Sequence, residues 1–160
     1  MNASDNSTLW RCGNCDRPFA NKNQSHSCGR YTVEAFLSGK PRNAVELYNR
    51  FLDVAQSCGP VLIAPAKTRI GLQVRMIFAA VNKLSEQGLD AHVVLARRLE
   101  HPRFRRIEEI SPINCVHHFR VKSVEEIDEE VAEWLREAYR VGKQEHLTGR
   151  AGRRPKTDLV

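Results

Sequence analysis

The stretch that decides the fold runs from Cys115 to Gly142 and reads CVHHFRVKSVEEIDEEVAEWLREAYRVG. In its first part, 115–121, side chains alternate between two faces, which predicts a strand with one face toward a core. Ser123 and Glu126 then form a capping box, so we expect a helix to begin at Ser123. Its apolar stripe faces the same core and consists of Ile127, Val131, Trp134, Leu135, Ala138 and Val141.

A second amphipathic helix is predicted upstream, from the N-cap Asn43 with Glu46 in a second capping box, to the stop signal Gly59-Pro60. Short apolar runs lie between the two helices, at 61–64, 70–76, 77–81 and 89–95. Their period of two and their short connections favour antiparallel over parallel pairing. The pattern predicts an α+β fold: a helix, an antiparallel β-meander and a closing helix, with both helices on one face of the sheet.

The length of 160 residues is enough for one such domain plus attachments. No apolar run approaches the roughly 18 residues that a membrane span needs, and residues 1–8 lack the basic start and apolar stretch of a secretory signal. We therefore expect a cytoplasmic location and no membrane partner. Five cysteines, an odd number, are then typical of reduced thiols or metal ligands rather than disulfides. The net charge of +6 favours anionic partners.

A metal site is predicted near the amino terminus, where Cys12 and Cys15 form a Cys-x-x-Cys turn between Trp10 and Phe19. The other two ligands are His26 and Cys28. Three thiolates and one imidazole make a closed structural Zn²⁺ site with no position left for a reactive water. The alternative is that these residues are unligated in a poorly ordered terminus. We favour zinc, because four ligands at plausible spacing between Cys12 and Cys28 seldom coincide by chance. The expected role of the ion is to fold a segment that is too short to fold alone.

The spacing of His26 and Cys28 departs from a two-cysteine, two-histidine finger, whose last ligands lie on a helix. Two residues apart, they fit a short strand or a tight turn, as in a zinc ribbon or knuckle. The base-reading helix of a finger is therefore missing, which disfavours sequence-specific DNA recognition. The predicted organisation is a disordered N-terminus at 1–9, a zinc-binding module at 10–39, the α+β domain at 43–142 and a basic disordered tail at 143–160.

An anion-binding surface is predicted from a cluster of arginines and from the last strand. On that strand His118 and Arg120 point away from the core face that carries His117. Phosphate groups of a nucleic acid are the partner that such a basic surface favours, although a solvated surface of mixed charge is an equally strong interpretation. The candidate residues are Arg97, Arg98, Arg103, Arg105, Arg106, His118 and Arg120.

An enzyme would use His118 or His101 as acid or base beside arginines that hold a small anionic or phosphorylated compound. The sequence contains no glycine-rich phosphate loop and no nucleophile elbow, so catalysis is the weaker hypothesis, and no catalytic residue is assigned. The tail around Gly152-Arg153-Arg154-Pro155 partly resembles an AT-hook, but the order of its residues differs, which favours a solubilising tail.

Four segments carry a resemblance to a known family: His101–Phe104, Ser111-Pro112, Val116–Val121 and, in the last helix, Asp128 with Glu137–Tyr139. Over about 43–142 the chain resembles a bacterial family known only as domain of unknown function five-six-five-five. The resemblance implies a helix, a meander and a closing helix. Some members look to be joined to restriction-endonuclease-like domains, which implies a nucleic-acid setting, and the family brings no known catalytic residues.

Three functional hypotheses follow from the sequence. The first is a non-catalytic zinc-binding module that associates with nucleic acid through its charge. The second is an enzyme that acts on a small anionic or phosphorylated substrate at the His118 strand face. The third is an adaptor whose zinc unit binds a protein partner.

Overall fold

The structure is a computed structural model that describes residues 9–147. The predicted disordered N-terminus at 1–9 and basic disordered tail at 143–160 lie outside the described residues at 1–8 and 148–160. In the described part of the tail, residues 143–144 form a turn and residues 145–147 are helical. The elements in chain order are β1 (Trp10–Arg11), β2 (Pro18–Phe19), α1 (Val33–Leu37), α2 (Arg42–Gln56), β3 (Leu62–Pro65), β4 (Ile70–Gln73), β5 (Ile77–Ser85), β6 (Gly88–Leu95), β7 (Phe104–Ser111), β8 (Asn114–Val121), the 3₁₀ turn η2 (Val124–Glu126) and α3 (Glu129–Gly142).

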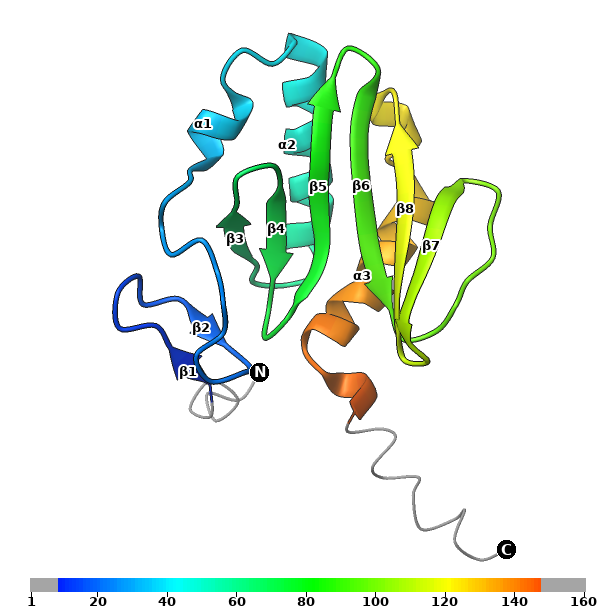
Figure 1. Ribbon diagram of the computed structural model, residues 1–160. Helices are drawn as coiled ribbons and strands as arrows, with labels where there is room; N and C mark the ends of the chain where they lie inside the picture. Colours follow the sequence, from blue (N-terminus) through cyan, green and yellow to red (C-terminus); the bar gives the residue numbers. More distant parts are fainter. Residues whose placement is uncertain (1–8, 148–160) are drawn as a thin grey trace, which may run out of the picture.

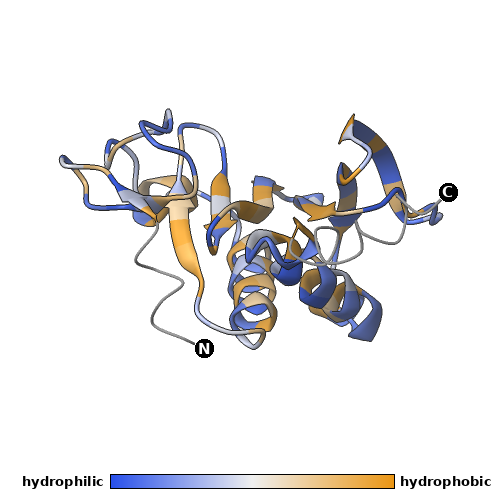
Figure 2. Cartoon of the chain, turned by 90° about the horizontal axis from the view of Figure 1, so that it is seen from below, coloured by the Kyte–Doolittle hydropathy of each residue, from blue (hydrophilic) through white to orange (hydrophobic). Residues whose placement is uncertain are grey.

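Two helices cover one face of a six-stranded antiparallel sheet, and this layering confirms the predicted α+β class. The strand order is β3-β4-β5-β6-β8-β7 (Figure 1). Seen along the sheet, α2 and α3 lie side by side on the same side of it (Figure 2). The opposite face, which we call the outer face, is covered by neither helix. Within residues 9–147 no helix is long and apolar enough to cross a membrane.

The strand β7 was not predicted, and it changes the topology at one end of the sheet. The chain leaves β6, forms β7 at the edge and returns through β8 between them, so the strands do not form a simple meander. Four of the eight residues of β7 are charged, which hides the strand in a sequence pattern. Within residues 9–147 β7 pairs with β8 alone. Main-chain hydrogen bonds to β8, rather than an apolar pattern of its side chains, therefore hold β7 in the sheet.

The core between helices and sheet is built by the predicted stripes. Phe51 of α2 and Leu135 of α3 are completely buried, and Phe51 lies 6.3 Å from Phe119 of β8 between ring centroids. Trp134 packs on Phe104 at 4.4 Å, which holds β7 against α3. Each such buried side chain stabilises the fold by roughly 1.5–3 kcal/mol.

Both predicted capping boxes are wrong. The helix α2 begins two residues earlier than expected, at Arg42 with Pro41 rather than Asn43 in the N-cap position, and it has no side-chain cap. Ser123 precedes only the turn η2, and α3 begins after Asp128, whose carboxylate accepts a hydrogen bond from the Val131 amide at 3.1 Å. The reason lies at Ile127, which is 3% exposed. The chain must first turn this side chain into the core, so the helix starts after it.

The N-terminal unit, by which we mean residues 9–31, packs against the end of β4. The amide of Gln73 is the contact: it accepts from Arg17 Nε at 2.8 Å and donates to the Pro18 carbonyl at 2.6 Å. Gln73 is only 1% exposed. A buried amide without partners costs about 1–3 kcal/mol, so these two bonds fix the unit on the sheet.

The short helix α1 follows the N-terminal unit and was also not predicted. Thr32 caps it by accepting from the Ala35 amide at 3.0 Å. Val33, Phe36 and Leu37 pack against the main core. Residues from 33 onward therefore contribute to the α+β core.

We expect Asp128→Ala to lower the free energy of unfolding by about 1 kcal/mol, because Ala cannot cap the helix. Asp128→Asn should retain most of the stability, since Asn caps equally well although it loses the ion pair with Arg103 at 3.1 Å. Urea denaturation measures both. A larger loss in Ser123→Ala than in Asp128→Ala would contradict the assignment of the cap.

Candidate metal centre and polar sheet face

Four side chains of the N-terminal unit converge as a group that could hold a metal ion. Cys12, Cys15, His26 and Cys28 place their ligand atoms within 4.8 Å of one another. The turn between β1 and β2 carries the first two, and it closes with a hydrogen bond from the Asp16 amide to the Cys12 carbonyl at 2.8 Å. Cys28 lies in a turn with φ of 55°, so the tight-turn form of the prediction, rather than a strand, is what the structure adopts.

The separations between ligand atoms fit a tetrahedral ion. Bonds of about 2.3 Å to sulfur and about 2.1 Å to nitrogen place ligand atoms about 3.6–3.8 Å apart. Cys12 Sγ and Cys28 Sγ are 3.7 Å apart, and Cys15 Sγ and His26 Nε2 are 3.3 Å apart. Little movement is therefore needed to bind a metal ion.

Surrounding groups orient the ligands. His26 Nδ1 donates to the Gln24 carbonyl at 2.7 Å, which leaves the Nε2 lone pair directed at the cysteines. Asn14 Nδ2 donates to Cys28 Sγ at 3.2 Å. The backbone amides of Cys15 and Asn14 lower the pKa of the Cys12 thiol to about 6, which favours the thiolate that binds a metal.

Two aromatic rings complete this small unit. Phe19 lies 4.5 Å from the His26 ring and 5.9 Å from Trp10, between centroids. Trp10 and Phe19 are paired across β1 and β2. With four protein ligands and these rings around it, the site can hold an ion for structure, and it offers no open position for chemistry on a substrate.

The remaining cysteines take no part in this site. Burial raises the pKa of both the Cys58 and the Cys115 thiols, as expected for small core side chains. The structure pairs none of the five cysteines in a disulfide, and all five lie within residues 9–147.

A second polar cluster lies on the outer face. A hollow of about 570 Å³, which we call the His118 hollow, lies over β5, β6, β8 and β7. His118 Nε2 lies 2.6 Å from Glu108 Oε2, and their bond lowers the pKa of that carboxyl group. The lining residues are Arg69, Asn82, Asp90, Ala91, His92, Arg105, Arg106, Glu108, Val116, His118 and Phe119.

His92 forms the floor of this hollow and is 7% exposed. Its ring is 5.3 Å from that of His118, and its Nδ1 accepts from Asn82 Nδ2 at 2.9 Å. Burial, followed by the nearby charges of His118 and Arg69, lowers the pKa of His92 to about 4. At neutral pH the ring is therefore uncharged, with its proton on Nε2.

The structure brings part of the predicted arginine cluster together. Arg105 and Arg106 line the His118 hollow, and Arg120 joins them through Asp90, which it binds at 2.5 Å and which also lies 3.9 Å from Arg105. Arg106 lies 3.0 Å from Glu108 and 3.3 Å from His118 Nε2.

The other three predicted arginines lie elsewhere and bind carboxylates. Arg97 makes a bidentate pair with Glu137 of α3, at 2.9 and 3.0 Å. Arg98 binds Glu100 and Glu109. Arg103 binds Asp128 and Glu130 and lies over the Trp134 ring, with 5.3 Å from its Cζ to the centroid. None of the three lines the His118 hollow.

His101 is likewise a structural residue. Its Nε2 lies 2.7 Å from Glu130 and its ring packs 5.2 Å from Trp134. His101 therefore lies on the side of the sheet that α3 covers, whereas His118 lies on the outer face. His117 is fully buried, and its Nε2 accepts from the Leu99 amide at 2.9 Å.

Sequence reasoning missed Arg69, Asn82 and Glu108 as lining residues of the hollow. Glu108 belongs to the unpredicted strand β7, and Asn82 follows directly after the predicted run 77–81, at an irregularity in the β5–β6 pairing. Arg69 precedes β4. The sequence could have indicated Glu108 only through the pairing of β7 with β8. In that pairing Glu108 lies opposite Val116, which shares a strand face with His118.

Comparison with known proteins gives one match. The family model described as "Domain of unknown function (DUF5655)" matches residues 33–142. No curated protein and no solved structure is detectably similar to the chain. The match begins where α1 begins and ends where α3 ends, so it spans the α+β fold and leaves the metal site outside.

His92 should make the fold sensitive to acid. Its pKa falls from 6.5 to about 4 on folding, so between these pH values the unfolded chain binds a proton that the folded chain does not. Because of this difference in proton binding at His92, the free energy of unfolding should be highest above pH 6.5. It should fall by about 3 kcal/mol as the pH is lowered to 4.

Urea denaturation of the natural chain and of His92→Gln over this pH range measures the effect. Loss of metal at low pH affects the natural chain and the variant equally. The difference between their free energies of unfolding therefore measures the effect of His92 alone. The difference should change with pH; parallel curves would contradict the assignment.

Proposed function

The chain belongs to the DUF5655 family, and from this premise we propose that it is a non-catalytic, zinc-binding accessory module that associates with nucleic acid in the cytoplasm. The family itself carries no assigned activity, so the proposal rests on the two sites of this chain. One is the Cys/His cluster of the N-terminal unit. The other is the His118 hollow with its arginines.

Zinc is the ion that this donor set favours. Three thiolates with one imidazole in tetrahedral arrangement are typical of structural zinc, whereas calcium and magnesium prefer oxygen ligands. The role of the ion is to fold residues 9–31, whose core consists of little more than Trp10 and Phe19. The unit then docks on Gln73 as a preformed piece.

The open, arginine-bearing outer face carries the proposal of nucleic-acid binding. Arg69, Arg105 and Arg106 surround the His118 hollow, and Arg120 lies beside it. Guanidinium groups bind phosphate oxygens in the bidentate manner that they use with carboxylates. Asp90 and Glu108 already pair with these arginines, so a phosphate must compete for them. We therefore expect weak binding that depends strongly on salt.

Recognition on this face is expected to depend on the backbone of the nucleic acid rather than on its bases. Phe104, the aromatic residue among the arginines, packs on Trp134 and His117 at 4.4 and 4.8 Å between centroids. Its ring is therefore not available to stack with a base. Charge without stacking gives little discrimination between sequences.

A second candidate function is catalysis on a small anionic or phosphorylated substrate, and the Glu108–His118 pair favours it. A carboxylate that holds an imidazole at 2.6 Å is the arrangement of an oriented general base. The neutral His92 beside it would offer an Nε2–H donor to an oxyanion. Nucleic-acid association is preferred, because the sequence offers no nucleophile or phosphate loop beside this pair.

Elemental analysis of the purified chain should find one zinc per molecule. Cys28→Ala should remove most of the zinc, because three ligands bind far more weakly than four, whereas the matched change Cys58→Ala should leave it in place. The far-ultraviolet circular dichroism of the α+β domain should change little in either variant. Zinc that stays bound in Cys28→Ala, or no metal in the natural chain, would contradict the site.

Binding of labelled single- and double-stranded oligonucleotides should be detectable at about 50 mM salt and should fall steeply toward physiological salt. Replacing Arg105 and Arg106 together by Ala should weaken binding about tenfold. The matched double change at Arg97 and Arg98 should have little effect, because these residues lie outside the hollow. Fluorescence anisotropy measures all three chains.

Two results would overturn the proposal. One is the absence of binding to DNA and RNA at about 50 mM salt. The other is equal weakening in the two double variants. If a nucleoside monophosphate binds in the hollow more tightly than the oligonucleotides, and binding depends on His118, the catalytic alternative is favoured instead.

A further inference from the structure

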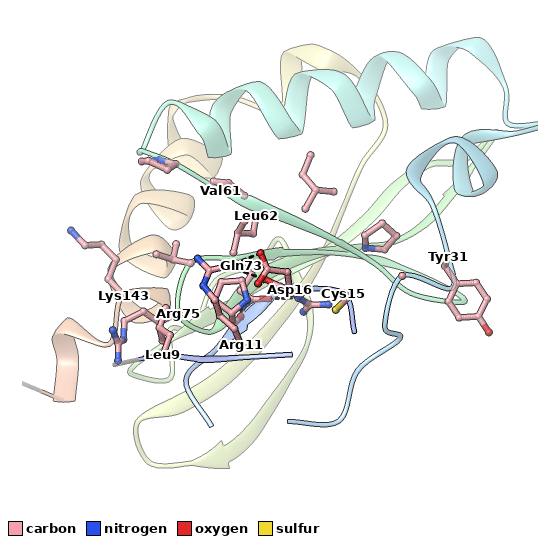
Figure 3. Close-up of a pocket in the computed structure, with 17 residues that line it drawn as sticks. Leu9, Arg11, Cys15, Asp16, Tyr31, Val61, Leu62, Gln73, Arg75 and Lys143 are labelled. Carbon is pink, nitrogen blue, oxygen red and sulfur yellow. Dashed lines mark hydrogen bonds and ion pairs between the residues drawn. The ribbon is translucent and has the colours of Figure 1, made fainter. Parts of the chain in front are cut away.

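A groove of about 750 Å³ separates the N-terminal unit from the free edge of the sheet. Figure 3 shows Leu9 and Arg11 on one side of it and Val61 and Leu62 on the other. We call it the edge groove. It contains residues from both faces of β3, so it runs along the edge of that strand.

The strand β3 has an unused hydrogen-bonding edge. It is the outermost strand on its side of the sheet, and its main-chain partner within residues 9–147 is β4. Leu62 on this strand is 40% exposed. An exposed edge with apolar side chains is a template for another strand.

The far wall of the groove is held in place. Arg17 and Pro18 line the groove and also make the two hydrogen bonds to Gln73 that fix the N-terminal unit to the sheet. The groove is therefore preformed, which lowers the entropic cost of binding.

The charge of the lining selects the partner. Arg11, Arg17, Arg75 and Lys143 line the groove, with Asp16 as the acidic side chain among them. Arg75 is held by Gln144 at 2.8 Å and Lys143 by Glu145 at 3.0 Å, which positions both cations at the rim. A strand that enters beside these cations gains from acidic side chains.

We propose that the edge groove binds an extended acidic peptide segment of a partner protein, which adds to β3 as a further strand. Alternate side chains of such a strand point to one face, so an apolar residue would pack on Leu62, and acidic residues of the same segment would lie near the cations of the lining. A second copy of the chain would bring like charges together at the same edge. The chain's own end beyond Leu147 carries Arg150, Arg153, Arg154 and Lys156 against one acidic residue, Asp158, so its charge does not match.

The test uses the full chain with zinc bound and a fluorescein-labelled peptide of sequence EVEIEVE. The peptide should bind, and the basic counterpart KVKIKVK should not. Leu62→Asp should weaken binding of EVEIEVE at least about tenfold, because it removes an apolar contact and adds a repelling charge. Ile110→Asp is the matched control: Ile110 is 69% exposed on β7, the opposite edge strand, and its change should have no effect.

Hydrogen exchange followed by nuclear magnetic resonance tests the mode of binding. The amide protons of β3 that point away from β4 should become protected on addition of EVEIEVE, as main-chain pairing at the free edge requires. The arginine changes that test nucleic-acid binding lie on other strands, so each proposal can fail without the other.

Four results would overturn the proposal. They are no binding of EVEIEVE, equal weakening by Leu62→Asp and Ile110→Asp, binding without protection of the β3 amides that point away from β4, and protection of those outward amides before peptide is added. In the last case, a dimer that Leu62→Asp abolishes would assign the edge to a second copy. A monomer would assign it to another segment of the chain itself.

Discussion

Burial of one face of the antiparallel sheet under α2 and α3 determines which side chains remain for binding. Side chains alternate along a strand, so neighbouring residues meet opposite environments. His117 is fully buried, and burial lowers the pKa of its ring. His118, the next residue, faces Glu108 and Arg106 in an open hollow. A slip of one residue in the β6–β8 register would exchange these two environments.

A single buried amide connects the metal-binding unit to this sheet. Gln73 would be costly to bury alone, and it is satisfied by Arg17 and Pro18 from a segment more than fifty residues earlier in the chain. Because the candidate metal ligands Cys12 and Cys15 flank the same turn, an ion bound there and the sheet would hold one piece of chain from two sides. The edge groove is a consequence of this docking.

The arginines show why closeness in sequence does not predict a common surface. Arg103 and Arg105 are two residues apart, yet Arg103 binds Asp128 and Glu130 on the helix side while Arg105 lines the outer hollow. A register shift in the pairing of β7 with β8, between Phe104 and Arg106, contributes to this separation. All six predicted arginines pair with carboxylates, which suits the mixed-charge interpretation. Arg105, Arg106 and Arg120 differ from the other three in that they lie at or beside the hollow.

The sequence by itself determined the α+β class, the apolar stripes of α2 and α3, the two faces of 115–121 and the four candidate ligands from Cys12 to Cys28. These features depend on short-range periodicity and on spacing within one segment, which the order of residues records directly. Tertiary structure decided the rest: the edge strand β7, the start of α3 at Asp128, the docking on Gln73 and the partners of each arginine. The physical reason is that hydrogen bonds between strands and ion pairs join residues far apart in the chain, so their energy has no local pattern.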